Sequence, residues 1–240
     1  MKKWLVLLVL VSFLSGEDFD EFDEFEQEMK VKKVSDPFSG YNRSMTSFND
    51  GLYDYVFQPV STGYKSISSS GFRTSIDNFF KNLMFPMRFL NNILQGKFHY
   101  AFVETGRFVV NSTAGCLGFF DPAKSEMGMQ VHDEDFGQTL GFYGVGAGPH
   151  IVLPVFGPSN LRDFTGAFAD AAISPIDYTD RDWPTVTKTW PEYLGVKAIE
   201  KFNTMTIYSN QYEEIRKDAV DLYPYLRDLY EQRRERLIEE

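Results

Sequence analysis

The sequence has 240 residues, a formal net charge of −10 at pH 7 and a single cysteine, Cys116. The negative charge disfavours nucleic-acid binding and polybasic adsorption to membranes, and one cysteine excludes a disulfide within the chain. Aromatic residues make up 16% of the chain. That proportion fits either contact with a membrane interface, where amphipathic rings are favoured, or a Phe-rich soluble core.

Residues 1–16 have the layout of a secretory signal peptide. Lys2 and Lys3 precede an apolar run over residues 4–14, and small residues follow it. The run is shorter than the roughly 18–20 residues that span a bilayer, and an uncleaved anchor is the alternative. Loss of the two lysines with the signal lowers the net charge from −10 to −12. Glu17 stands where a lipoprotein signal has its acylated Cys, so we expect an exported chain that is not acylated at its N-terminus.

Residues 17–35 form an acidic leader that carries Phe19, Phe22 and Phe25 among carboxylates. Such a segment buries too little apolar surface to offset its ordering entropy, so we predict that it is disordered. A solvated leader and a tail that contacts a partner or a membrane both fit this composition. The remaining residues, 36–240, are predicted to form one domain.

Short amphipathic helices dominate the predicted fold, which is mostly α. Apolar residues recur at helical spacing in segments bounded by Pro or Gly. We expect Pro59 to end the first helix, and Ser70 and Ser159 to cap two others. The predicted helices cover residues 45–56, 70–83, 86–94, 98–109, 136–140, 159–172, 193–205 and 211–240.

The middle of the chain has a different pattern. Residues 151–156 are apolar and extended, because Pro154 is incompatible with a regular helix. Residues 115–128 are predicted to be a loop, and residues 171–187 a loop or a hairpin.

The sequence contains only weak motifs for catalysis or metal binding. The run from His132 to Asp135 suggests a metal site, but carboxylates that oppose a helix dipole are the simpler interpretation. No HExxH, CxxC or G-x-S-x-G pattern occurs, which argues against zinc and against a lipase. We expect no metal and no cofactor, and we expect Cys116 to be a small buried apolar residue.

Several ordered segments identify a family resemblance. They include residues 36–45, Phe48-Asn49, residues 91–97, Gly144-Val145-Gly146, Gly157-Pro158-Ser159 and Leu161-Arg162-Asp163, and the densest is residues 132–141. Together they resemble the MlaA/VacJ family of outer-membrane lipid-asymmetry proteins, strongly over residues 36–170 and loosely to the end.

The resemblance implies a ring-like array of helices, monotopic in the inner leaflet of the outer membrane. A central amphipathic channel would let phospholipid leave the outer leaflet toward the periplasm. The implied partners are phospholipid, a trimeric outer-membrane porin and a soluble periplasmic lipid carrier, and the chain would not be an enzyme. The alternatives are a soluble periplasmic lipid-acting hydrolase and a secreted structural or adhesion protein.

The lipid channel and its gate are assigned to eight residues. Flexible glycines would let the Pro-bearing loop of residues 171–184 swing and change the channel width, whereas glycines that only permit tight packing are the alternative. The eight residues are Phe48, Asn49, Gly141, Gly144, Gly146, Gly148, Pro175 and Ile176.

Overall fold

The computed structural model describes residues 36–176 and 186–240. The predicted signal peptide and acidic leader lie outside the described residues, and so do Glu17 and most of the loop assigned to gating. The predictions for those segments therefore stay predictions.

The first part of the described chain is one continuous helical run. It consists of α3 (Ser39–Leu52), the π-helical turn η1 (Tyr53–Phe57) and α4 (Gln58–Ile67). The prediction that Pro59 ends a helix is wrong. Pro59 lies in the first turn of α4, directly after the π turn, where the Gln58 N–H donates to the Tyr53 carbonyl five residues back. Pro59 has no N–H to donate, and the wider π turn before it, whose bonds run five residues back, leaves the helical run unbroken.

Three helices follow. They are α5 (Ser70–Leu83), α6 (Phe85–Leu94) and α7 (Phe98–Thr113). The cap of α5 is Ser69, one residue before the predicted Ser70, and its hydroxyl accepts from the Phe72 N–H. Gly96, at φ +73°, ends α6 in the left-handed conformation that glycine adopts readily. The predicted opening of α6 by Pro86 is confirmed, with the proline in the first turn.

The middle segment contains two short helices and a hairpin. Residues 115–128, predicted to be a loop, include α8 (Pro122–Ser125), and α9 (Phe136–Phe142) follows. Strands β1 (His150–Leu153) and β2 (Gly157–Asn160) pair antiparallel, with His150 opposite Asn160. The extended conformation predicted for residues 151–156 is therefore confirmed for its first half, while its second half is the hairpin turn.

The last three helices are α10 (Leu161–Ile173), α11 (Trp190–Asp218) and α12 (Leu222–Glu239). The cap of α10 is Asn160 and not Ser159, because the Asn160 side chain reaches the Asp163 N–H. The predicted break between residues 205 and 211 is wrong. Hydroxyls of Thr206 and Ser209 bond to carbonyls of the same helix, and α11 continues to Asp218.

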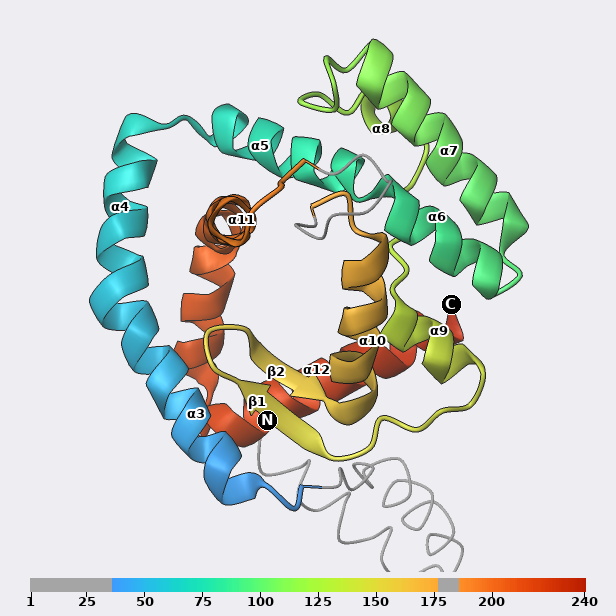
Figure 1. Ribbon diagram of the computed structural model, residues 1–240. Helices are drawn as coiled ribbons and strands as arrows, with labels where there is room; N and C mark the ends of the chain where they lie inside the picture. Colours follow the sequence, from blue (N-terminus) through green and yellow to red (C-terminus); the bar gives the residue numbers. More distant parts are fainter. Residues whose placement is uncertain (1–35, 177–185) are drawn as a thin grey trace, which may run out of the picture. The chain divides into compact units, whose positions relative to one another are not determined.

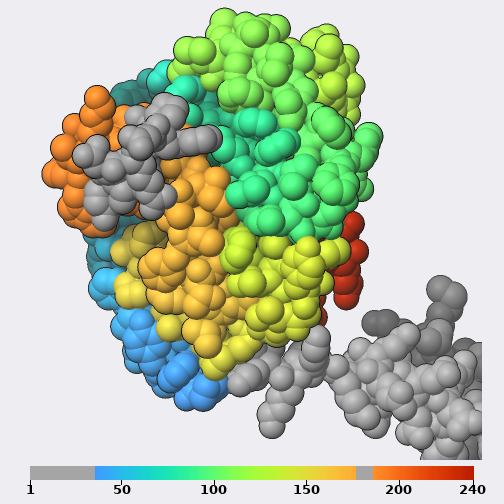
Figure 2. Space-filling view, turned by 45° about the vertical axis from the view of Figure 1, so that its right-hand side comes forward, coloured from blue at the N-terminus to red at the C-terminus, as the bar shows by residue number. Residues whose placement is uncertain are grey.

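Figure 1 shows the elements of residues 36–176 and 186–240 arranged as a ring, in which α11 returns to lie beside α4 and α5. Contacts of α11 with α4 and α5, of α9 with α10 and α12, and of α3 with β1 and α12 close this ring. Figure 2 shows the face on which α10 packs beside α9 and α6. The prediction of a mostly α, ring-like array of short helices is confirmed.

Buried side chains in this ring are largely polar, and many apolar ones are exposed. Glu104 pairs with Arg88 at 2.7 Å, with both side chains buried. Tyr55, Ile67 and Phe102, in contrast, are among the most exposed large apolar residues. Within the described ranges, no helix is both long enough and apolar enough to cross a bilayer.

Candidate functional site

An apolar cavity of about 570 Å³ lies between the α3–η1–α4 run, the hairpin and α11. Volumes of this size are typical of small-molecule sites. Its wall is formed by Thr46, Asn49, Leu52, Tyr53, Val56, Phe57, Val60, Val152, Val155, Phe156, Gly157, Pro158, Ala198, Lys201, Phe202, Met205, Tyr208, Tyr212 and Leu226.

Helical spacing accounts for one apolar wall. Leu52, Val56 and Val60 lie four residues apart, so they share one face of the continuous helical run. Val60 is 55% exposed although it is apolar, and Phe156 at the hairpin turn is also exposed. Exposed apolar side chains that border a cavity gain about 25 cal/mol per Å² when an apolar ligand covers them.

Asn49 joins α3 to the turn of the hairpin. Its Nδ2 donates to the Leu153 carbonyl at 3.0 Å, and its Oδ1 accepts from the Val155 N–H at 2.7 Å. Val155 has φ +68°, which a β-branched residue adopts only when its surroundings hold it there. The amide of Asn49 therefore fixes the hairpin turn at the edge of the cavity.

Asn42 makes the same pair of bonds two helical turns earlier. Its Nδ2 donates to the His150 carbonyl at 3.1 Å and its Oδ1 accepts from the Val152 N–H at 2.9 Å. Asn42 and Asn49 are seven residues apart and lie on one face of α3. The two amides act as an additional edge partner for β1 and hold the hairpin against α3.

Aromatic rings fasten α11 to the π turn. The ring centroids of Phe57 and Phe202 are 5.4 Å apart, and those of Tyr53 and Tyr212 are 4.7 Å apart. Contacts of this kind contribute about 1 kcal/mol beyond the burial of their area. They hold the two longest walls of the cavity at a fixed spacing.

A charged cluster stands beside these rings. Arg216 pairs with Asp50 and with Asp54, each at 2.7 Å, and lies over the Tyr53 ring. Burial and the nearby Asp50 raise the pKa of Tyr212, so this phenol stays protonated and donates to that carboxylate. The cluster fixes the α3–α11 contact by polar bonds.

Among the described residues of the cavity wall, Lys201 alone is charged. Burial lowers the pKa of its ammonium, Glu200 acts in the opposite sense, and Lys197 adds to the lowering. Lys197 itself pairs with Glu200 at 2.8 Å. An ammonium at an otherwise apolar wall can bind an anionic group through a charge-assisted hydrogen bond.

Of the predicted channel residues, the structure brings only Asn49 into the cavity wall. Phe48 is the neighbour of Asn49 on α3 and has an exposed side chain. Pro175 accepts a bond from the Val186 N–H, and Ile176 is fully buried. Their roles in the channel stay predictions.

The four predicted hinge glycines differ from one another. A Cβ on Gly141 would lie 2.5 Å from Ile238 Cδ1, so this glycine permits close packing of α9 on α12. Gly144 and Gly148 have φ of +84° and +71°, while Gly146 has open space around it and an ordinary φ. Packing and turn geometry thus account for three of them.

In residues 132–135, the carboxylates of Glu134 and Asp135 are bound by neighbouring groups. Asp135 caps α9 by accepting from the Gln138 N–H at 2.8 Å, as the dipole argument predicts. Glu134 pairs with Lys97 at 2.7 Å and accepts from Gln95. The part of the chain that is described holds no cluster of metal-binding side chains.

Cys116 departs from its prediction. It is exposed, not buried, and has φ +53° in a turn where Leu117 and Gly118 also have positive φ. Apolar sequence neighbours suggested burial, but the turn projects outward because three consecutive left-handed residues reverse the chain after α7. Leu117 is exposed as well.

Two residues of the site were missed. Asn42 lay in the matched segment, and its spacing of seven from Asn49 indicates a shared face, but the hairpin it contacts is over 100 residues away. Lys201 lies in a predicted helix without any motif. Only the folded structure places its side chain in the apolar wall.

Comparison with known proteins decides the family. A family model described as MlaA lipoprotein matches residues 34–237. This chain belongs to the MlaA lipoprotein family. A solved structure described as "Structural basis for maintenance of bacterial outer membrane lipid asymmetry" matches with a TM-score of 0.72 at 30% identity. The match covers 85% of this chain and 99% of the other.

Named MlaA relatives share most of their length with this chain. The Escherichia coli (strain K12) protein "Intermembrane phospholipid transport system lipoprotein MlaA" is 32% identical over 202 residues, 83% of this chain and 76% of that protein. The Haemophilus influenzae protein of the same name is 30% identical over 227 residues, 93% of this chain and 87% of that protein. A protein of Rickettsia bellii is 32% identical over 85% of this chain and 77% of its own.

Proposed function

We propose that this protein passes phospholipid from the outer leaflet of the bacterial outer membrane toward the periplasm and so maintains lipid asymmetry. Its MlaA relatives carry phospholipid transport in their names. The observation that carries the proposal is the apolar cavity of about 570 Å³, in which Lys201 is the single charged residue of the described wall. The function requires no bond to be made or broken.

The cavity has the two chemical properties that a phospholipid requires. Each buried CH₂ of an acyl chain contributes about 0.8 kcal/mol, and Val56, Val60 and Phe156 supply apolar surface for it. The ammonium of Lys201 can bind the phosphate oxygen of the headgroup. A lipid would then lie with its chains along α3–α4 and its phosphate toward α11.

We place the protein in the inner, periplasm-facing leaflet of the outer membrane, where it would be monotopic and would not span the bilayer. Exposed aromatic residues such as Phe102 on α7 and Phe168 on α10 support this placement, because burial of such rings among acyl chains stabilises a monotopic protein. The proposed partners are a trimeric porin beside the ring and a soluble periplasmic carrier that receives the lipid. Retention without an acylated Cys at residue 17 is part of the same proposal.

Native mass spectrometry of the chain extracted from membranes tests the cavity directly. Wild-type protein should retain phospholipid. Val60→Asp places a carboxylate in the apolar wall and should remove most of that lipid. Val220→Asp is the control, since Val220 lies fully exposed in the turn between α11 and α12, whereas Val60 is 55% exposed and lines the cavity. Equal lipid occupancy in the two variants would contradict the proposal.

A further inference from the structure

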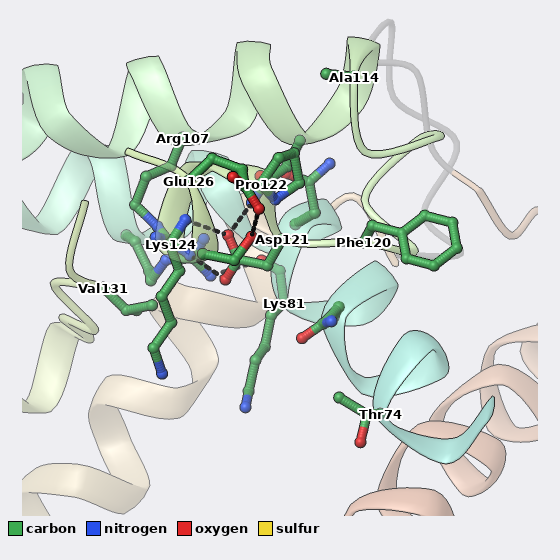
Figure 3. Close-up of a pocket in the computed structure, with 15 residues that line it drawn as sticks. Thr74, Lys81, Arg107, Ala114, Phe120, Asp121, Pro122, Lys124, Glu126 and Val131 are labelled. Atoms are coloured by element: carbon green, nitrogen blue, oxygen red, sulfur yellow. Dashed lines mark hydrogen bonds and ion pairs between the residues drawn. The ribbon is translucent and has the colours of Figure 1, made fainter. Parts of the chain in front are cut away.

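A second cavity, of about 770 Å³, lies between α5, α6, α7 and the segment around α8, and Figure 3 shows its wall. None of its lining residues belongs to the apolar cavity. Its wall has polar residues on two helices, with Thr74, Asn78 and Asn82 on one face of α5 and Asn111 on α7.

Cations outnumber carboxylates in this wall, although the whole chain has a net charge of −10. Carboxylates that balance two of the cations stand outside the wall. Asp77 pairs with Lys81 at 2.6 Å, and Glu104 pairs with Arg88 at 2.7 Å. The charged lining residues are Lys81, Arg88, Arg107, Lys124, Asp121 and Glu126.

Arg107 is held in the wall by the carboxylate of Asp121. Its side chain is only 6% exposed, its Nη2 donates to Asp121 at 2.7 Å, and its Nη1 donates to the Met129 carbonyl. Its buried Nε has no hydrogen-bond partner among the described residues. Burial acts to raise the pKa of Asp121, but bonds from Arg107 and Asn111 outweigh it and hold that pKa below its usual range. Asp121 therefore stays ionised and paired with Arg107.

Lys124 supplies a positive charge that can bind a ligand. It is exposed on α8, and its ammonium forms no ion pair within the described part of the chain. Figure 3 shows the side chains of Lys81 and Lys124 extending in the same direction on one side of the cavity. The amides of Asn82 and Asn111 already donate to Ser112 and Asp121, which leaves the Thr74 hydroxyl and the Asn78 amide as donors in the wall. These donors and the two ammonium groups match the several acceptor oxygens of a phosphate group.

We propose that this cavity binds a phosphate group, carried by a phospholipid headgroup or free, through Lys124 and Lys81. Phe120 and Val131 add apolar surface to the same wall. The site goes beyond the proposed transport function, because it is separate from the apolar cavity and can bind its ligand whether or not lipid is moved.

The test uses the full chain in an uncharged detergent with ¹³C-methylated lysines, followed by NMR. The probes are inorganic phosphate and dihexanoylphosphatidylglycerol below its micelle concentration. The Lys124 signal, assigned by its loss in Lys124→Gln, should shift saturably with both. Lys124→Gln should weaken binding about fivefold, as for an exposed charge contact, and Lys124→Glu should weaken it further. Lys217→Gln, an exposed lysine at the end of α11, is the matched control and should bind as wild type.

The two probes separate the sources of the phosphate. Tighter binding of the lipid, with displacement of inorganic phosphate, assigns the site to a headgroup, whereas equal or tighter binding of inorganic phosphate assigns it to the free ion. Both results support the phosphate site. A Lys124 signal that does not shift, or a folded Lys124→Glu protein with wild-type affinity, would overturn it. Val60→Asp should leave this binding unchanged, so failure of the transport proposal is distinguishable.

Discussion

The side-chain amide of Asn49 accepts the backbone N–H of Val155 at 2.7 Å, across 106 residues of sequence. With the bond from Asn49 Nδ2 to the Leu153 carbonyl, this contact holds the hairpin turn at the edge of the apolar cavity. The hairpin thus depends on a helix side chain for the positive φ of Val155.

Asn49→Ala should lower the free energy of unfolding by about 1 kcal/mol, because two backbone groups lose their partner near solvent. It should also reduce bound phospholipid, since the hairpin turn forms part of the cavity wall. Denaturant unfolding in detergent and native mass spectrometry measure the two effects. Asn42→Ala is the comparison. It should lower stability more, because Asn42 is fully buried, but it should keep more lipid, because Asn42 does not line the cavity.

Gly141→Ala and Gly146→Ala distinguish packing from a hinge. The first places a Cβ 2.5 Å from Ile238 Cδ1 and 3.0 Å from Arg162 Nη1, so these two side chains must shift and the substitution should cost about 1 kcal/mol of stability. The second meets nothing within 4 Å and should change stability by less than about 0.5 kcal/mol. Thermal unfolding measures both. If the Gly146→Ala protein keeps its stability but no longer passes lipid, that result supports the hinge interpretation. If lipid passage is unchanged, the hinge interpretation is wrong.

Arg234 should not be replaceable by lysine. Its guanidinium binds both oxygens of Asp135, at 2.6 and 2.8 Å, and also reaches Asp163, so it ties α12 to α9 and α10. Arg234→Lys keeps the charge but loses the two-pronged geometry and should cost about 2 kcal/mol by denaturant unfolding. The adjacent Arg233 is exposed, and Arg233→Lys is expected to leave stability unchanged. Similar losses of stability for both substitutions would contradict the stabilising role of the Arg234 contacts with Asp135 and Asp163.

Asp170 should make stability depend on pH in an identifiable window. Burial raises its pKa to about 6, while the Phe136 N–H bond opposes the shift and Asp135 adds to it. A carboxyl whose folded pKa exceeds its unfolded value of 3.8 contributes its stability below pH 4 and loses it as pH rises to about 6. Asp170→Asn should therefore gain stability over wild type between pH 4 and 6, by up to about 3 kcal/mol, with a constant difference above. The exposed Asp218→Asn is the control, and a pH-independent difference for Asp170→Asn would contradict the assignment.

Local sequence patterns predicted the helices, but they could not predict contacts between residues that are far apart in the sequence. Gly96 and Asp135 end or cap helices by rules that act within four residues, and both were predictable. The continuation of the helix past Pro59 depends on a π turn whose rings pack on α11, and no local rule contains that partner. Cys116 was misjudged because its neighbours are apolar but its backbone is left-handed.

The candidate site was less predictable than the fold. Asn49 was assigned to the channel from the resemblance and does line the cavity, while Pro175 and Ile176 do not. Lys201 and the cavity around Lys124 carry no sequence motif. Their chemistry arises only when α11 meets α3, and when α5 meets α7 and α8.

The content of phospholipid in the outer leaflet of living cells tests the central claim most directly. In a strain that lacks the gene, surface labelling of phospholipid headgroups should show accumulation, and the wild-type gene should reverse it. Val60→Asp, produced at equal level, should fail to reverse it, while Val220→Asp should succeed. An outer leaflet that stays unchanged when the gene is deleted, or that Val60→Asp restores as well as wild type, would contradict phospholipid passage through the apolar cavity.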